Sequence, residues 1–214
     1  MSPPIVLASR SPRRSELLRL IVPAERIVVR PPPSAEEESF DNLTTLPAIM
    51  LRLLEIARHK HDQTLEILRH EGQPFAALIA ADTVVVVSDA DGRPVVLGQP
   101  PAGPGQNALV RQWFREYYAG REHQVQTGVC LSVCRSDQFA TKSFVVTSTV
   151  KFLADIEPWL DWYLETGESA GKAGGYALQG AGSLFVDQVT GSLSNVVGLP
   201  IREVKSALVE LGFC

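Results

Sequence analysis

Residues 76–87, Ala-Ala-Leu-Ile-Ala-Ala-Asp-Thr-Val-Val-Val-Val, are among the longest apolar stretches of the chain. Their length and their β-branched end predict a buried central strand. The stretch carries one charge, Asp82. A carboxylate buried without a partner is costly, so Asp82 needs a cation, a metal ion or a cluster of donors. Beside a cleft it could hold Mg²⁺ or orient an attacking water. The alternative is a structural aspartate that loop amides satisfy.

Strands and helices alternate on both sides of this strand, which predicts a mixed α/β fold. Ahead of it we expect strands at residues 5–8 and 22–29, a helix with Ser11 as N-cap, and a helix from Pro47 to Lys60 or beyond. After it we expect an Asp91-Gly92 hairpin with a strand at 95–97, helices at 107–118, 156–166 and 199–211, antiparallel strands at 124–134 and 139–152, and a strand at 183–189. The expected architecture is a curved mixed sheet with flanking helices, forming one domain (residues 1–214) of two lobes around a groove.

Composition narrows the classes of function. The chain has 214 residues and a formal net charge of −4. That charge argues against a general nucleic-acid-binding surface, which needs an excess of cations. Three cysteines are too few for a disulfide framework, and Cys130 and Cys134 lack the histidine partners of a zinc site, so we expect buried free thiols. We find no signal peptide and no apolar run near the roughly twenty residues that a membrane helix needs. We therefore expect a cytoplasmic protein without a membrane partner.

The first candidate site is a predicted strand-to-helix turn, Ser9-Arg10-Ser11-Pro12-Arg13-Arg14. A helix N-terminus offers unpaired N–H groups and a partial positive charge, and guanidinium groups bind phosphate in a bidentate way. The alternative is an ordinary helix start with solvated arginines. Arginines in a first helical turn oppose the helix dipole, however, and an anionic partner would explain them.

The second candidate is a glycine-rich segment, residues 171–180, which holds Lys172 and Tyr176. Glycines let a backbone approach a ligand closely, the lysine supplies a charge, and the tyrosine offers a stacking face. A segment of this composition could bind phosphate, a base or both. It matches neither of the two common glycine-rich nucleotide motifs, so alone it is a weak signal.

Other polar groups have ordinary explanations. Glu36, Glu37 and Glu38 lie in a proline-rich loop, where a run of charges is usually solvated, although one of them could bind a metal if the loop covers the cleft. Lys60 is expected at a helix end, where a cation complements the dipole. The tryptophans at 113, 159 and 162 fall at helical positions, and we expect them to pack in the core or in a lobe, the alternative being platforms on which bases stack.

Six segments together resemble one known family from end to end. They are Leu7-Ala8-Ser9-Arg10-Ser11-Pro12-Arg13-Arg14 with Glu16-Leu17-Leu18, Ala57-Arg58-His59-Lys60, Ala81-Asp82-Thr83-Val84-Val85, Gly120-Arg121-Glu122-His123 with Thr127-Gly128-Val129, Lys172-Ala173-Gly174 through Gln179-Gly180, and Ser194-Asn195-Val196-Val197-Gly198-Leu199-Pro200. In this order the segments resemble the Maf proteins.

The resemblance implies a fold like that of inosine triphosphate pyrophosphatases, usually dimeric, with a cleft between two lobes. It implies hydrolysis of a nucleoside triphosphate between the α and β phosphates, dependent on Mg²⁺ or Mn²⁺. By position, Asp82 is the proton acceptor. Arg14, Thr83 and Gln179 match positions linked to substrate choice. Ser9, Arg13, Lys60 and Lys172 match phosphate contacts. Glu37 is the best match for the glutamate that binds metal with Asp82, and Glu36 aligns almost as well.

The pattern Lys-Ala-Gly-x-Tyr-x-x-Gln-Gly, residues 172–180, is similar to that of the subfamily acting on dTTP and UTP, and modified pyrimidine nucleotides would suit a house-cleaning role. The branch that prefers 7-methyl-GTP typically lacks this arrangement. One residue departs from the family: Gln99 stands where Gly-Lys-Pro is usual. Losing that cation could cost a few kcal/mol of transition-state stabilisation. Arg93 and Lys172 are the candidates to compensate.

Two other functions stay open. Some Maf proteins are linked to arrest of cell division, so the chain could be a catalytically weakened nucleotide-binding regulator in which Gln99 marks lost activity. A scaffold with Ser11-Pro12 as a kinase site is a third hypothesis. For the enzyme, the expected partners are a nucleoside triphosphate and a second copy of the chain.

Overall fold

The predicted central strand lies in the middle of a seven-stranded mixed sheet. The computed structural model describes residues 3–33, 38–135 and 138–213. The strands are β1 (Ile5–Ala8), β2 (Ile27–Val29), β3 (Ala77–Ser88), β4 (Pro94–Leu97), β5 (Glu122–Arg135), β6 (Gln138–Phe152) and β7 (Val186–Thr190). Their order is β2-β1-β3-β5-β6-β7, and β4 pairs with β3. β1 runs parallel to β2 and β3, and the other pairs are antiparallel. The mixed α/β class is confirmed.

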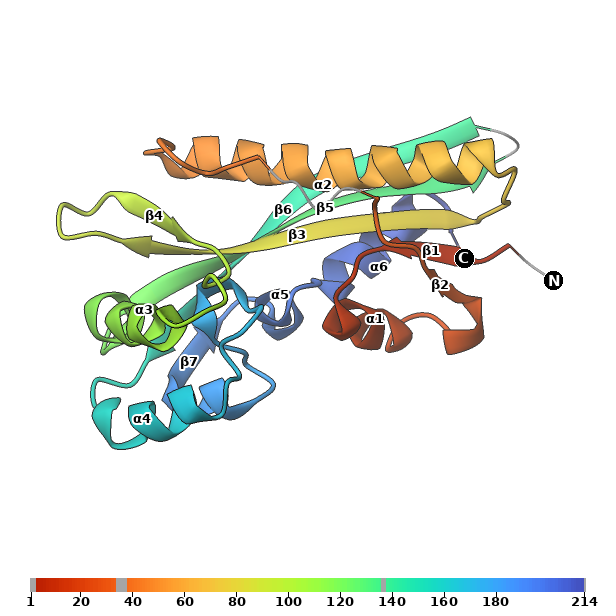
Figure 1. Cartoon of the computed structure of the whole chain (residues 1–214). Coiled ribbons are helices and arrows are strands. Elements are labelled where there is room, and N and C mark those ends of the chain that lie inside the picture. The colour runs from red at the N-terminus through yellow and green to blue at the C-terminus, as the bar shows by residue number, and fades with distance from the viewer. Residues whose placement is uncertain (1–2, 34–37, 136–137, 214) are drawn as a thin grey trace.

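Helices cover both faces of the sheet (Figure 1). The long helix α2 lies along one face, and the other helices lie on the opposite side. They are α1 (Pro12–Arg19), α2 (Leu46–His70), α3 (Gln106–Trp113), α4 (Glu157–Glu165), α5 (Leu193–Val197) and α6 (Ile201–Glu210), together with a π-helical turn after α3 (Phe114–Tyr118) and short 3₁₀ turns at Ala24–Arg26, Ala173–Gly175 and Ala181–Phe185.

The side chains of β3 alternate between two faces and so build separate cores. Leu78 and Val84, on one face, pack in clusters that include residues of α2. Ile79 packs on the other face with residues of α1 and α6, whereas Val85 joins an aromatic cluster built by α3, the π-helical turn and α4. The cluster of α1 and α6 and the aromatic cluster thus occupy successive stretches of the same face. The single domain of two lobes over residues 1–214 stays a prediction.

The edge of β3 that faces β1 is interrupted. The pairing with β1 ends at Ala80, and the pairing with β4 on this same edge begins at Val85. Within the described ranges, residues 81–84 have no strand partner on this side, while β5 pairs with all of them on the other. The chain therefore leaves an open stretch of strand edge at the Asp82-Thr83 pair.

Some predicted boundaries were wrong. The strand expected at residues 22–29 is shortened to β2, because the chain after Pro23 forms a 3₁₀ turn. The strand expected at 183–189 begins only at Val186, since Ala181–Phe185 is another 3₁₀ turn. The short helix α5 was not expected.

Helix α2 also differs from the prediction. It continues to His70, so Lys60 lies inside the helix and the explanation of this residue as a helix-end cation was wrong. Leu51 on this helix is 56% exposed. Trp159 and Trp162 on α4 are also about half exposed, at 52% and 48%, so neither is a core residue.

The thiol prediction can be checked for two of the three cysteines. Cys130 is buried and Cys134 half-buried, and both are free. Burial raises the pKa of the Cys130 thiol above its ordinary value. Cys214 lies outside the described residues. No helix within the described part of the chain is long and apolar enough to cross a membrane.

Candidate active site

A cavity of about 890 Å³ opens at the interrupted edge of β3. Its walls come from the turn between β1 and α1, from β3, from the turn after β4, and from two later segments near residues 170–178 and 196–198. Seven of the residues predicted for the site line it: Ser9, Arg13, Arg14, Lys60, Asp82, Thr83 and Lys172. Segments far apart in the sequence thus meet where the strand edge is open.

Asp82 is paired with a lysine. Its Oδ1 lies 2.6 Å from Nζ of Lys60, and the two side chains are only 11% and 15% exposed. The alternative interpretation was an aspartate held by loop amides. In the structure its partner is instead Lys60 of α2, the helix on the same face of the sheet. A nearly buried pair of this kind restricts the orientation of the carboxylate.

A glycine lets α2 come close enough for this pair. Gly128 of β5 lies directly opposite Asp82 in register. A Cβ placed on Gly128 would lie 2.8 Å from the carbonyl oxygen of Leu53, a residue of α2. Lys60 follows Leu53 by about two helical turns. Gly128 belongs to one of the segments that resemble the family, but no role was predicted for it. A lone glycine inside a strand is the signal that could have suggested a close backbone approach.

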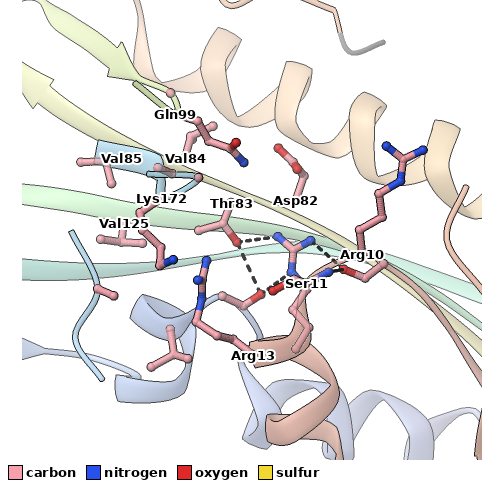
Figure 2. Close-up of a pocket in the computed structure, with 18 of the residues that line it drawn as sticks. Arg10, Ser11, Arg13, Asp82, Thr83, Val84, Val85, Gln99, Val125 and Lys172 are labelled. Atoms are coloured by element: carbon pink, nitrogen blue, oxygen red, sulfur yellow. Dashed lines mark hydrogen bonds between the residues drawn. The ribbon is translucent and has the colours of Figure 1, made fainter. Parts of the chain in front are cut away.

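Thr83 and Asp82 leave β3 on opposite sides (Figure 2). The Thr83 Oγ1 accepts a hydrogen bond from Nη2 of Arg14 at 3.0 Å. The same guanidinium donates through Nε to the carbonyl of Gly198 at 2.9 Å and through Nη1 to Oγ of Ser9 at 3.3 Å. Arg14 thus ties α1 to β3 and to the segment between α5 and α6. Through these hydrogen bonds Arg14 holds together three segments that line the cavity.

Arg13 and Lys172 place two cations in the same part of the cavity (Figure 2). Burial lowers the pKa of Lys172, and the nearby charge of Arg13 lowers it further. Burial also lowers the pKa of Arg13, an effect that Glu16 and Glu168 partly offset. Two partly desolvated cations that repel each other favour an anion between them. The start of α1 adds its partial positive charge to the same wall.

Gln99, which stands where the resemblance implies a lysine, also lines the cavity. Of the two candidates to compensate for that cation, Lys172 lines the cavity, as described. Arg93 instead lies in the turn between β3 and β4, is 67% exposed at its side chain and pairs with Asp91 at 3.4 Å. Arg93 is therefore not a cation of the cavity wall.

Of the two remaining predicted site residues, Gln179 and Glu37, the structure describes only Gln179. The Gln179 side chain is exposed and lies outside the cavity lining, one residue beyond Leu178, which belongs to it. Glu37, the predicted metal ligand, and Glu36 lie outside the described residues. Glu38 lines the cavity, but its side chain is 62% exposed and pairs with Arg52 at 2.9 Å.

Comparison with known proteins adds the family. The profile described as "Maf-like protein" matches residues 4–211. A "dTTP/UTP pyrophosphatase" from Anaeromyxobacter dehalogenans (strain 2CP-C) is 37% identical, over 100% of this chain and 96% of the relative. One of the same name from Syntrophus aciditrophicus is 36% identical, over 97% and 90%. A "Nucleoside triphosphate pyrophosphatase" from Rickettsia akari is 33% identical, over 98% and 94%. The protein therefore belongs to the Maf-like family.

Proposed function

We propose that this protein hydrolyses a nucleoside triphosphate, dTTP or UTP, to the monophosphate and pyrophosphate. The observation that carries the proposal is the Lys60–Asp82 pair at 2.6 Å in a cavity that also holds Arg13 and Lys172. One carboxylate is thereby set beside cations suited to a polyphosphate. The names of the relatives support the two pyrimidine substrates.

In the proposed reaction Asp82 is the proton acceptor. Lys60 holds Oδ1, and we assign Oδ2 to the water that attacks the α-phosphorus. The new P–O bond forms as the bond to the β-phosphate oxygen breaks, and pyrophosphate leaves with the bond electrons. Arg13 and Lys172 neutralise the charge of the triphosphate and of the departing pyrophosphate.

The donors in the cavity fit a divalent metal ion that is shared with the substrate. No group of three or more His, Cys, Asp or Glu residues within the described ranges could hold a metal by itself. Mg²⁺, however, is usually bound by one or two carboxylates together with substrate phosphates. Asp82 supplies one carboxylate, and we propose Glu37 as the second. When bound, Mg²⁺ or Mn²⁺ would withdraw charge from the phosphate oxygens.

The cavity also has apolar and aromatic lining residues, which suit the nucleoside. Val85, Val125, Tyr176 and Val196 are among them. Thr83, two positions before Val85 on β3, and its hydrogen-bond partner Arg14 line the same cavity, which supports their proposed role in substrate choice. Gln179 would have to turn toward the cavity to share that role. The proposal includes a homodimer in the cytoplasm, which gel filtration and cell fractionation test.

The decisive variant is Asp82→Asn. We expect release of pyrophosphate from dTTP and UTP with Mg²⁺ or Mn²⁺ to fall by about 10²- to 10⁴-fold, the usual contribution of a positioned base. Asp187→Asn is the matched control, because its side chain is 43% exposed and pairs with Lys151 at a distance of 3.3 Å on the surface. Circular dichroism should show that both variants fold. Turnover at the wild-type rate in Asp82→Asn would remove this residue from the reaction.

A second candidate is a regulator that binds nucleotides without turnover. It is favoured by Gln99, a neutral amide in the cavity wall where a lysine is usual. A panel of nucleoside triphosphates that includes 7-methyl-GTP separates the candidates. Tight binding without pyrophosphate release supports the regulator, and release from 7-methyl-GTP alone would correct the substrate.

A further inference from the structure

Three consecutive residues of the glycine-rich segment are each held by an aromatic or imidazole side chain. The Oη of Tyr118 donates to the carbonyl of Gly174 at 2.8 Å. The Oη of Tyr163 donates to the carbonyl of Gly175, also at 2.8 Å. The next residue, Tyr176, makes a hydrogen bond of 2.7 Å through its hydroxyl to Nε2 of His123. Two backbone carbonyls and one side chain that follow Lys172 closely in the sequence are therefore held in place.

The side chains that make these hydrogen bonds are themselves packed in the core, so they cannot move with the glycine-rich segment. Tyr118 and Tyr163 are fully buried, and both rings contact Phe114, at centroid distances of 5.3 and 5.4 Å. His123 is 3% exposed and also contacts the ring of Tyr118, at 4.5 Å. Burial lowers the pKa of His123 to about 3, so its ring is neutral. Rings packed in this way act as a rigid support under the segment.

The backbone of the segment is shaped to fit that support. Gly174 and Gly175 have φ angles of 69° and 75°, which glycine adopts without strain. A Cβ on Gly174 would lie only 2.5 Å from Oη of Tyr118. The N–H of Gly174 in turn donates to the carbonyl of Gly98 at 2.9 Å. The glycine-rich segment that carries Lys172 is thus joined to the turn after β4 that carries Gln99, and both line the cavity.

We propose that Tyr118 and Tyr163 are positioning residues for this hydrolysis, because their hydroxyls fix the backbone from which Lys172 reaches the triphosphate. Neither tyrosine lines the cavity, so each acts through the segment that it holds. The inference rests on the proposed function and adds to it two residues from separate elements, the π-helical turn and α4.

The test is a double-mutant cycle. Tyr118→Phe removes the hydroxyl and keeps the ring in its cluster, leaving the buried Gly174 carbonyl without its donor. We expect kcat/KM for UTP to fall by about tenfold, the size of one lost buried hydrogen bond, mainly through a higher KM. In a Lys172→Ala background the same change should lower kcat/KM by less than about twofold. Tyr117→Phe is the matched control, since the hydroxyl of this neighbour interacts with Glu116 instead.

A purely structural role predicts another pattern. In that case Tyr118→Phe lowers the melting temperature and reduces kcat/KM by the same factor with or without Lys172, and the proposal is overturned. Tyr163→Phe gives an independent cycle should Tyr118→Phe fail to fold. If neither tyrosine variant shows coupling to Lys172, the tyrosines do not position Lys172 for the triphosphate.

Calorimetric titration with inorganic tripolyphosphate separates this inference from the proposed function. The cycle can be measured in binding even if no nucleotide is hydrolysed, in which case the hydrolysis proposal fails and the positioning role survives as coupled affinity. If nucleotide is hydrolysed but the tyrosine variants show no coupling to Lys172, only the positioning role is contradicted. A wild-type protein that neither binds tripolyphosphate nor hydrolyses a nucleotide overturns both.

Discussion

Replacing Gly128 by alanine should disturb the Lys60–Asp82 pair without touching either residue. The added Cβ would lie 2.8 Å from the carbonyl oxygen of Leu53 and 3.0 Å from its Cγ. Ordinary contact begins near 3.4 Å, so α2 and β5 must separate by about 0.6 Å at this point. Both contacts belong to the helix that carries Lys60, and the oxygen is backbone, so rotation of a side chain alone cannot relieve the clash.

The size of the effect follows from this displacement. Overpacking a close helix–strand contact costs about 1–3 kcal/mol, which for a chain of this size lowers the melting temperature by roughly 2–12 °C. If α2 moves as a unit, the 2.6 Å bond between Lys60 and Asp82 lengthens past the range of a strong charge-assisted bond. Because a misplacement of about 1 Å can cost 10²-fold in rate, we expect kcat/KM to fall by about 10- to 100-fold.

The assay combines thermal unfolding with pyrophosphate release from UTP. Gly105→Ala is the matched control, because a Cβ there meets nothing within 4 Å and its φ of −95° suits any residue. Gly128→Ala with wild-type melting temperature and rate would refute the close-approach argument. A lower melting temperature with an unchanged rate would show that the position of α2 does not control Asp82.

Two further predictions concern charge. Gln99→Lys should raise kcat/KM for UTP by about tenfold or more, since it adds a cation to the phosphate-binding cavity, and an unchanged rate would place the phosphates away from this wall. For His123, the folded pKa of about 3 lies below the ordinary 6.5, so only the unfolded chain gains this proton between those values. The free energy of unfolding should therefore drop by about 1.4 kcal/mol per pH unit below about pH 6.5. Urea unfolding at about pH 7 and about pH 5 measures how much unfolding free energy is lost on acidification. We expect this loss to be roughly 2 kcal/mol smaller in His123→Gln than in the wild type, and an equal loss in both would contradict the buried neutral ring.

The main strands could be predicted because their signal is local. The apolar run around Asp82 and the two long alternating stretches lie as expected in β3, β5 and β6. The 3₁₀ turn before β7 depends on a distant group: Glu168 accepts hydrogen bonds from the amides of Ala181 and Gly182 at 2.6 and 2.9 Å. No pattern within residues 181–185 reveals that carboxylate, so the predicted strand began too early, at residue 183.

The candidate site was predictable as a set of residues but not as a set of contacts. Lys60 was expected to meet phosphate, yet its partner in the structure is Asp82, which depends on how α2 packs across β3 and β5. Arg14 was linked to substrate choice, whereas its guanidinium bonds the carbonyl of Gly198, 184 positions along the chain. Spacing identifies residues of suitable chemistry, and only the packing of distant elements decides which of them pair.

The alternation along β3 has a consequence for how such a chain can change over time. Asp82 and Thr83 are adjacent in the sequence but work on opposite sides of the strand. Side chains alternate between the two faces of the sheet along β3. Inserting or deleting one residue ahead of this pair would therefore move each following side chain to the opposite face. The aspartate would then face α1 and the threonine α2, with every apolar neighbour inverted as well. Length variation should therefore be tolerated in the hairpin beyond Ser88 and rejected between Ala77 and Thr83.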